Sequence, residues 1–202
     1  MKAWHAIVPL KQGTAAKSRL SGVLTPQQRQ LLSDAMARHV LSVLERCHLI
    51  AELSLLAPNP LQGWQGRWVR DVGIGLNAAL ERWSNDQIGA KRLIIHADLP
   101  LLSPEDVDGF LAGAEKAGGA MATDRAGTGT NAMALPAGRA INFCFGPESR
   151  RLHAPQIGER NVLEFPGVAF DIDTPDDLDR LPASLVDSWL KADRGQPTQL
   201  SA

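Results

Sequence analysis

The sequence predicts an α/β domain built as three layers, with helices on both sides of a mostly parallel sheet. Short apolar runs typical of buried strands, such as residues 4–10, 52–57 and 93–97, alternate with longer segments in which apolar residues recur at helical spacing. Most polar residues of chemical interest follow the ends of these strands. Because open α/β sheets bind ligands at the carboxyl ends of their strands, this distribution predicts one site at one edge of the sheet.

Composition limits the classes of partner. The 202-residue chain is 44% hydrophobic and 21% charged, as in an ordinary soluble domain, and its net charge of −1 argues against a nucleic-acid or membrane partner held by bulk electrostatics. It has no signal peptide and no apolar run long enough to span a bilayer, so we expect a cytoplasmic protein. Cys47 and Cys144 predict buried, reduced thiols rather than a disulfide framework. We expect a single domain over residues 1–190 and a polar tail over 191–202.

A basic loop follows the first predicted strand. Lys11, Lys17 and Arg19 are separated by Gly13 and small residues, a composition suited to neutralising the oxygens of a triphosphate. The spacing is neither a Walker A loop nor a dinucleotide-binding Gly-x-Gly-x-x-Gly. A solvated basic loop is the alternative interpretation, and it is disfavoured because an acid is predicted at the same edge of the sheet.

That acid is Asp98, which ends the central strand. The strand begins near residue 93 as Leu-Ile-Ile, and Pro100 prevents it from continuing. A carboxylate at this position would be partly desolvated and would need a cation. Capping of the next helix is the alternative, but Ser103 supplies a better cap. We expect His96, which precedes Asp98 on the buried strand, to be a hydrogen-bonded core residue.

A second group of acids lies near the carboxyl end. Asp171 and Asp173 are two residues apart on a predicted extended segment, so their side chains share one face. Two such carboxylates repel each other unless a cation joins them, and oxygen ligands favour Mg²⁺ or Mn²⁺ over zinc. Asp176 and Asp177 are expected to serve the N-terminus of the following helix instead.

Three further stretches are rich in glycine and polar groups. Gly73 and Gly75 precede a helix that begins with Leu76 and Asn77, where an amide side chain and backbone donors could read a nucleobase or ribose. A plain glycine turn is the equal alternative there. The loop 126–131 alternates glycine and threonine, and Ser149 begins a helix beside two arginines; both are suited to an anion.

Six motifs occur in the order found in a known family. They are Ala-Ala-Lys-Ser-Arg-Leu at 15–20, Gly-Leu-Asn-Ala-Ala at 75–79, Ala-Asp-Leu-Pro-Leu-Leu at 97–102, Asp-Arg-Ala-Gly-Thr-Gly-Thr-Asn at 124–131, Phe-Gly-Pro-Glu-Ser at 145–149 and Asp-Ile-Asp-Thr-Pro at 171–175. With them the chain resembles the 2-phospholactate guanylyltransferase family of coenzyme F420 biosynthesis. The resemblance implies a nucleotidyltransferase fold, which is glycosyltransferase-A-like and Rossmann-like. It also implies a metal-dependent enzyme that joins GTP to a small phosphorylated carboxylic acid and releases pyrophosphate.

The resemblance implies roles for individual residues as well. Asp98, Asp171 and Asp173 match the family's acids that hold Mg²⁺ or Mn²⁺, and Asp98, Lys17 and Arg19 are the predicted catalytic residues. The predicted substrate-binding residues are Lys11, Lys17, Arg19, Gly75 and Asn77 for GTP, and Thr130, Gly146 and Ser149 for the phosphorylated acid. The product would pass to a separate deazaflavin transferase. A homodimer is compatible with the sequence, but no feature of the sequence decides the oligomeric state.

The predicted acid-binding loop departs from the family's usual Phe-Gly-x-Gly-Ser. Glu148 replaces the second glycine, and Arg150 stands where an aromatic residue is common. The family's acceptors are 2-phospho-L-lactate, phosphoenolpyruvate and 3-phospho-D-glycerate, and the altered loop favours 3-phosphoglycerate. Two alternatives remain: another nucleotidyltransferase of this fold, such as a molybdenum-cofactor guanylyltransferase or a sugar-nucleotide synthase, or a non-catalytic nucleotide-binding protein.

Overall fold

The computed structural model describes residues 3–13 and 16–191. Six strands form one sheet: β1 (Trp4–Pro9), β2 (Ile50–Ala57), β3 (Arg67–Arg70), β4 (Lys91–Ile95), β5 (Ala120–Ala122) and β6 (Ala132–Leu135). The α-helices are α1 (Pro26–Arg46), α2 (Leu76–Asp86), α3 (Pro104–Ala117), α4 (Ser149–Ile157), α5 (Pro166–Ala169), α6 (Pro175–Leu178) and α7 (Ala183–Lys191). Two 3₁₀ turns, η1 (Ser18–Leu20) and η2 (Glu159–Asn161), complete the described elements.

The sheet has the strand order β3-β2-β1-β4-β6-β5. The first four strands of this order are parallel to one another, whereas β6 runs antiparallel to both β4 and β5. The register pairs Ile95, at the end of β4, with Ala132, at the start of β6. The residues that precede β6 therefore reach the same edge of the sheet as the residues that follow β4. The predicted mostly parallel sheet is confirmed, and β6 is its one reversed strand.

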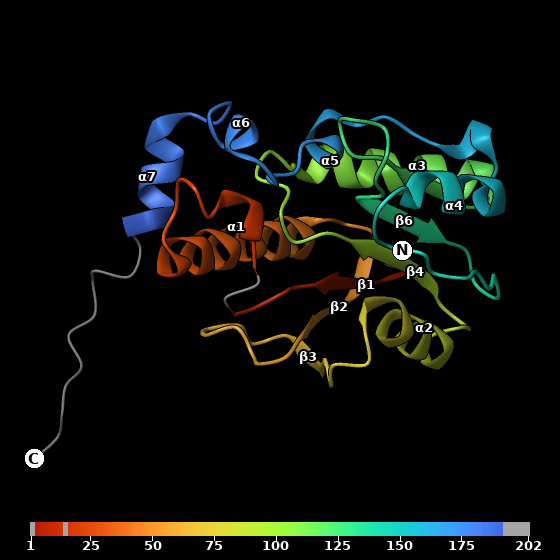
Figure 1. Ribbon diagram of the computed structural model, residues 1–202. Coiled ribbons are helices and arrows are strands. Elements are labelled where there is room, and N and C mark those ends of the chain that lie inside the picture. The colour runs from red at the N-terminus through yellow and green to blue at the C-terminus, as the bar shows by residue number, and fades with distance from the viewer. Residues whose placement is uncertain (1–2, 14–15, 192–202) are drawn as a thin grey trace, which may run out of the picture.

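Helices lie on both sides of the sheet (Figure 1), and alternating side chains on the strands divide the core into two layers. On one face, strand residues such as Ala6, Val8 and Leu93 pack with α1 and α3. On the other face, Ile7, Ile94 and their neighbours pack with α2 and α4. This alternation is the period-2 pattern of strands that are covered on both sides, and it confirms the predicted three-layer architecture.

Helix starts follow their local sequence. Thr25, Ser103 and Thr174 each accept a hydrogen bond from a backbone amide in the first helical turn, and proline follows each of them. Helix α4 begins differently, because its N-cap is Glu148 in a left-handed conformation with φ of 57°. Glycine adopts this conformation without strain, so Glu148 occupies a backbone position that favours glycine.

A third apolar cluster lies under the end of the chain. Leu20, Leu32, Met36 and Ile172 are buried in it, and residues of α7 pack against it. Helix α7 ends at Lys191, the first residue of the predicted tail, and the rest of that tail lies outside the described residues. Cys47 is buried as expected, but Cys144 is only half-buried, so the expectation of two buried thiols is wrong for Cys144.

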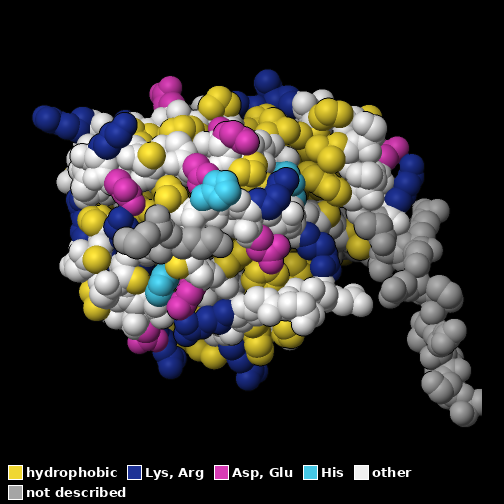
Figure 2. Space-filling model, turned by 180° about the vertical axis from the view of Figure 1, so that it is seen from behind, with side chains coloured by type: hydrophobic (Ala, Val, Ile, Leu, Met, Phe, Trp, Pro, Cys, Tyr) yellow, Lys and Arg dark blue, Asp and Glu magenta, His cyan; other side chains and the backbone are white. Residues whose placement is uncertain are grey.

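The surface agrees with the near-neutral charge of the sequence. On the face seen in Figure 2, acidic and basic side chains are interspersed. None of the helices in the described ranges combines the length and the apolar character that a membrane span requires.

Candidate functional site

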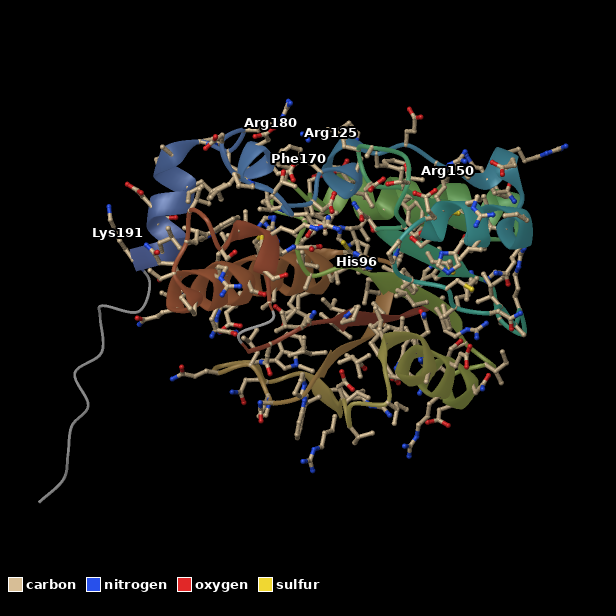
Figure 3. The ribbon with its side chains drawn as sticks, in the orientation of Figure 1. His96, Arg125, Arg150, Phe170, Arg180 and Lys191 are labelled. Carbon is tan, nitrogen blue, oxygen red and sulfur yellow. The ribbon has the colours of Figure 1, made fainter. Side chains whose placement is uncertain are left out.

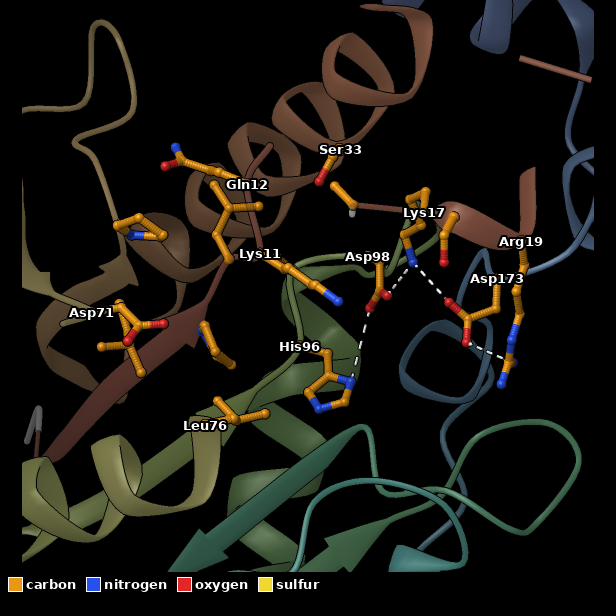
Figure 4. A pocket seen from close by; sticks show the side chains of 17 residues that line it. Lys11, Gln12, Lys17, Arg19, Ser33, Asp71, Leu76, His96, Asp98 and Asp173 are labelled. Atoms are coloured by element: carbon orange, nitrogen blue, oxygen red, sulfur yellow. Dashed lines mark hydrogen bonds and ion pairs between the residues drawn. The ribbon is translucent and has the colours of Figure 1, made fainter. Parts of the chain in front are cut away.

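A cavity of about 570 Å³ lies at the carboxyl ends of β1, β2 and β4. Its charged and titratable lining residues are Lys11, Lys17, Arg19, Asp71, His96, Asp98 and Asp173 (Figure 4). Leu56, Leu76 and Ala97 are among the apolar residues that complete the wall. The basic loop after β1 and the acid after β4 therefore share one cavity, as the sequence predicts.

Lys17 is the central cation of this cavity. Its backbone adopts a left-handed conformation with φ of 48°, just before η1, and its side chain is only 9% exposed. The Nζ atom donates a hydrogen bond to Asp98 and lies 3.0 Å from Oδ1 of Asp173 (Figure 4). Burial alone would lower the pKa of Lys17, but the two carboxylates outweigh burial and raise it. The ammonium is thus a permanent positive charge between two of the predicted metal-binding acids.

Arg19 and Lys11 occupy more open positions. Arg19 lies 3.5 Å from Asp173 as an exposed ion pair, an arrangement that contributes little to stability. Lys11 follows β1 and lines the same cavity. Both side chains can therefore serve an anion at modest cost in folding energy.

Asp98, Asp171 and Asp173 come together as the sequence predicts. Each offers one carboxylate oxygen, and these oxygens lie within 4.8 Å of one another. A backbone hydrogen bond connects the two segments: the amide of Ile172, between Asp171 and Asp173, donates to the carbonyl of Asp98 at 3.2 Å. Burial of Ile172 in the third apolar cluster then fixes the segment that carries both later acids.

Electrostatics favour a cation at these acids. Burial, together with repulsion from Asp98 and Asp173, raises the pKa of Asp171 to about 6. Burial opposes ionisation of Asp98 too, but Lys17 overcomes it and the pKa of Asp98 is lowered. Oδ1 of Asp98 is buried and has no hydrogen-bond partner among the described residues. A divalent cation with oxygen ligands would fit this donor set.

Asp177 lies at the start of α6, as the sequence predicts for it. Asp177 accepts hydrogen bonds from the backbone amide and hydroxyl of Thr174 at the start of α6, and it pairs with Arg125 at 2.7 Å. Its pKa is lowered: burial opposes this, but these hydrogen bonds and Arg125 prevail. Asp177 therefore serves the helix start rather than the acid cluster.

His96 differs from its prediction. It follows β4 at the centre of the molecule and lines the cavity (Figures 3 and 4). Its Nδ1 lies 3.9 Å from Oδ1 of Asp98, and its Nε2 is buried without a partner in the described part of the chain. Burial, with Lys17 nearby, lowers its pKa. The expectation of a hydrogen-bonded core residue is therefore wrong, because β4 ends at Ile95 and the side chain of His96 lies at the cavity wall.

Asn77 has both ends of its amide engaged. It accepts a hydrogen bond from the backbone amide of Phe145 at 2.8 Å and donates one to the carbonyl of Phe145 at 3.1 Å. In this arrangement the side chain fixes the predicted acid-binding segment. Gly75 is the N-cap of α2, with φ of 92°, and its neighbour Leu76 lines the cavity. The prediction that Gly75 and Asn77 contact GTP stays a prediction.

Thr130, Gly146 and Ser149 lie on two loops that are held together. The amide of Arg150 donates to the carbonyl of Thr128 at 3.0 Å, which joins the loop before β6 to the start of α4. Thr130 and Ser149 are each only 2% exposed. These three residues do not line the described cavity itself, so their proposed contact with an acid remains a prediction.

The sequence patterns do not single out His153. Its Nδ1 lies 3.0 Å from Oγ1 of Thr130, and its Nε2 accepts a hydrogen bond from the amide of Cys144 at 2.8 Å. A signal for it existed, because residues four apart share one face of a helix and His153 stands four residues after Ser149.

The chain is similar to proteins of one family. The family described as "Guanylyl transferase CofC like" matches residues 4–182. A phosphoenolpyruvate guanylyltransferase of Rubrobacter xylanophilus is 39% identical over 195 residues, covering 89% of this chain and 93% of the relative. One from Sphaerobacter thermophilus is 36% identical, covering 87% and 91% of the two chains.

Solved structures agree on the fold. A structure from Desulfovibrio desulfuricans G20, described as a nucleotide-diphospho-sugar transferase, has a TM-score of 0.71 at 16% identity and covers 95% of this chain and 98% of that one. A nucleotidyl transferase from Methanothermobacter thermautotroptrophicus has a TM-score of 0.59 at 16% identity, covering 95% and 100%. The predicted nucleotidyltransferase fold is thereby confirmed. The chain belongs to the CofC-like guanylyltransferase family and is a nucleotidyltransferase enzyme.

Proposed function

We propose that this enzyme transfers the guanylyl group of GTP to phosphoenolpyruvate in coenzyme F420 biosynthesis. The observation that carries the proposal is the cluster of Lys17, Asp98, Asp171 and Asp173, which combines a buried ammonium with three converging carboxylates; Lys17, Asp98 and Asp173 line one cavity. Phosphoryl-type transfer needs positioning and charge neutralisation more than a protein nucleophile. This cluster supplies both.

In the proposed reaction, a phosphate oxygen of the acid attacks the α-phosphorus of GTP. A new P–O–P bond forms, the bond from the α-phosphorus to the bridging oxygen breaks, and pyrophosphate leaves with that electron pair. Lys17 would donate to an oxygen at the reacting phosphate, while Lys11 and Arg19 neutralise the leaving pyrophosphate. Asp98, Asp171 and Asp173 would hold Mg²⁺, which supplies positive charge beside the triphosphate.

The choice of acid rests on relatives and on the departures in the loop. Relatives at 39% and 36% identity are named phosphoenolpyruvate guanylyltransferases, which supports phosphoenolpyruvate. 3-Phosphoglycerate, favoured by the altered loop, is the second candidate. In the structure Glu148 is exposed and Arg150 is paired with Glu159 at 3.2 Å. The product would then pass to a separate deazaflavin transferase.

The test is pyrophosphate release with GTP and Mg²⁺ in the presence of each acid separately. We expect release with phosphoenolpyruvate and much slower release with 3-phosphoglycerate or 2-phospholactate. Replacing GTP with ATP at the same concentration measures the base preference. Release with 3-phosphoglycerate alone would overturn the proposed acid but keep the reaction, whereas silence with all three acids would overturn the reaction.

A further inference from the structure

A buried hydrogen-bonded chain links the segment after residue 142 to the loop before β6. The backbone amide of Cys144 donates to Nε2 of His153, and Nδ1 of His153 faces Oγ1 of Thr130 at 3.0 Å. His153 is fully buried, and Thr130 is 2% exposed. The direction of the first hydrogen bond in this series is therefore fixed, because the backbone amide of Cys144 can only donate.

The hydrogen bond from Cys144 determines the tautomer of His153. Since Nε2 accepts a hydrogen bond, it carries no proton, and a neutral imidazole must then carry its proton on Nδ1. Burial, with a smaller contribution from His96, lowers the pKa of His153 to about 4, so the ring is neutral near pH 7. Nδ1–H then donates to Oγ1 of Thr130.

The same argument determines whether the hydroxyl of Thr130 accepts or donates each of its hydrogen bonds. A hydroxyl has one proton, and Oγ1 of Thr130 already accepts from His153. Its own proton is thus free to be given to another acceptor. We infer that His153 is a positioning residue that makes Thr130 an obligate hydrogen-bond donor toward an anionic oxygen of the phosphorylated acid.

The surroundings support an anionic acceptor near Thr130. Its neighbour Asn131 donates to Oδ1 of Asp171 at 3.4 Å, which brings the loop beside the acid cluster. The ring of Phe145 lies 4.9 Å from His153 and 5.4 Å from the cavity-lining His96. The loop that carries Thr130 therefore touches the acid cluster through Asn131 and faces the buried His153 through Thr130 itself. The inference rests on the proposed function, because that function supplies the phosphorylated acid.

The first experiment observes the tautomer directly in the unliganded protein. Long-range ¹H–¹⁵N NMR distinguishes a protonated from an unprotonated imidazole nitrogen, and His153→Phe assigns the signals. We expect a proton on Nδ1 and none on Nε2 at pH 7. A proton on Nε2 would overturn the inference whatever the enzyme's substrate is.

The second experiment is a double-mutant cycle of His153→Phe and Thr130→Val, assayed by pyrophosphate release. Each single variant should raise KM for the acid about tenfold, with KM for GTP unchanged, because one hydrogen bond to a charged group is lost. The double variant should be no worse than either single variant. His153→Gln, which keeps an acceptor and a donor, should recover most of the loss.

His39→Phe is the matched control. His39 is a half-buried histidine whose Nε2 is hydrogen-bonded to the carbonyl of Leu102, away from Thr130, so the variant reports the cost of losing such a contact elsewhere. Its KM for the acid should equal that of the wild type. Multiplicative effects in the double variant, or an equal rise in both KM values, would overturn the inference. If the wild type released no pyrophosphate with any acid, the proposed function would fail while the NMR result still decided the tautomer.

Discussion

Two neighbouring regions of the molecule solve the problem of buried polar groups in opposite ways. Around Lys17 the groups are charged: one ammonium faces Asp98 and Asp173, and Asp171 remains imperfectly compensated. Around His153 they are neutral and form a hydrogen-bonded chain that starts at a backbone amide and ends at the hydroxyl of Thr130. The charged region stores repulsion that a cation relieves, whereas the neutral region fixes the direction of its hydrogen bonds and leaves one hydroxyl proton to be donated.

The largest effect should come from removing the most buried acid of the charged region. Asp98→Asn takes away one cation ligand and the main partner of Lys17. We expect kcat/KM for guanylyl transfer to fall about 1,000-fold, because charge stabilisation carries this type of reaction. Asp187→Asn, on the exposed side of α7, is the control and should leave the rate unchanged. Near-normal transfer by Asp98→Asn would contradict the assignment of Asp98.

Lys17→Met tests how much of the cluster depends on the ammonium. The variant leaves Asp98 without its ammonium partner and Asp173 with only the exposed Arg19, and it should lower the free energy of unfolding by about 3 kcal/mol, as for other broken buried ion pairs. Added Mg²⁺ should restore part of that loss by occupying the acids. Denaturant unfolding with and without Mg²⁺ measures both quantities. A stability equal to that of the wild type would mean that the ammonium is solvated and not part of the cluster.

Asp171→Asn should raise the free energy of unfolding, whereas Lys17→Met lowers it. The pKa of Asp171 is raised from its ordinary value of 3.8 to about 6, so the folded protein disfavours the ionised form. Above pH 6 the variant should be more stable than the wild type by about 2 kcal/mol, a figure reduced for partial solvent exposure. The difference should shrink as pH falls from 6 toward 3.8 and vanish well below 3.8, where the wild-type carboxyl is protonated in both the folded and the unfolded state. Thermal unfolding at pH 7.5 and 4.5 without Mg²⁺ tests this; a gain that grows at low pH would refute it.

The smallest effect belongs to the neutral region. Asn77→Ala removes two hydrogen bonds to the backbone of Phe145 and should cost about 1 kcal/mol of stability. The looser segment should raise KM for the acid about threefold and leave KM for GTP within error. Asn85→Ala, an exposed position on the same helix, is the control. A larger rise in KM for GTP than for the acid would favour the original prediction that Asn77 contacts the nucleotide.

The sequence predicts the charged region better than the neutral one. Asp98 ends an apolar strand just before Pro100, and Asp171 and Asp173 alternate on an extended segment, so their convergence follows from strand chemistry. The position of Lys17 among these acids depends on the left-handed backbone conformation of Lys17 itself. A lysine in a loop of small residues does not predict that conformation. Residue spacing therefore predicts that the acids converge, but it does not predict that Lys17 pairs with two of them.

The neutral region depends on strand direction, which periodicity does not encode. Residues 132–135 form a short apolar run that would suit a strand running either way. Only because β6 is antiparallel does Thr130 reach the end of β4, and only then can His153 face it. His96 illustrates the same limit, since whether a residue at a strand end faces the core or a cavity depends on the walls around it.

The antiparallel strand β6 places residues 123–131 in a hairpin loop that can vary independently of the rest of the sheet. Strands β5 and β6 form a hairpin, and residues 123–131 are its loop, so this loop can be lengthened or exchanged while β4 and the segment with Asp171 keep their places. The hydrogen bond from Arg150 to Thr128 couples the loop to the start of α4. Under the proposed function, changing the acceptor preference would require transplanting both loops as one module, with Asp98, Asp171 and Asp173 left in place.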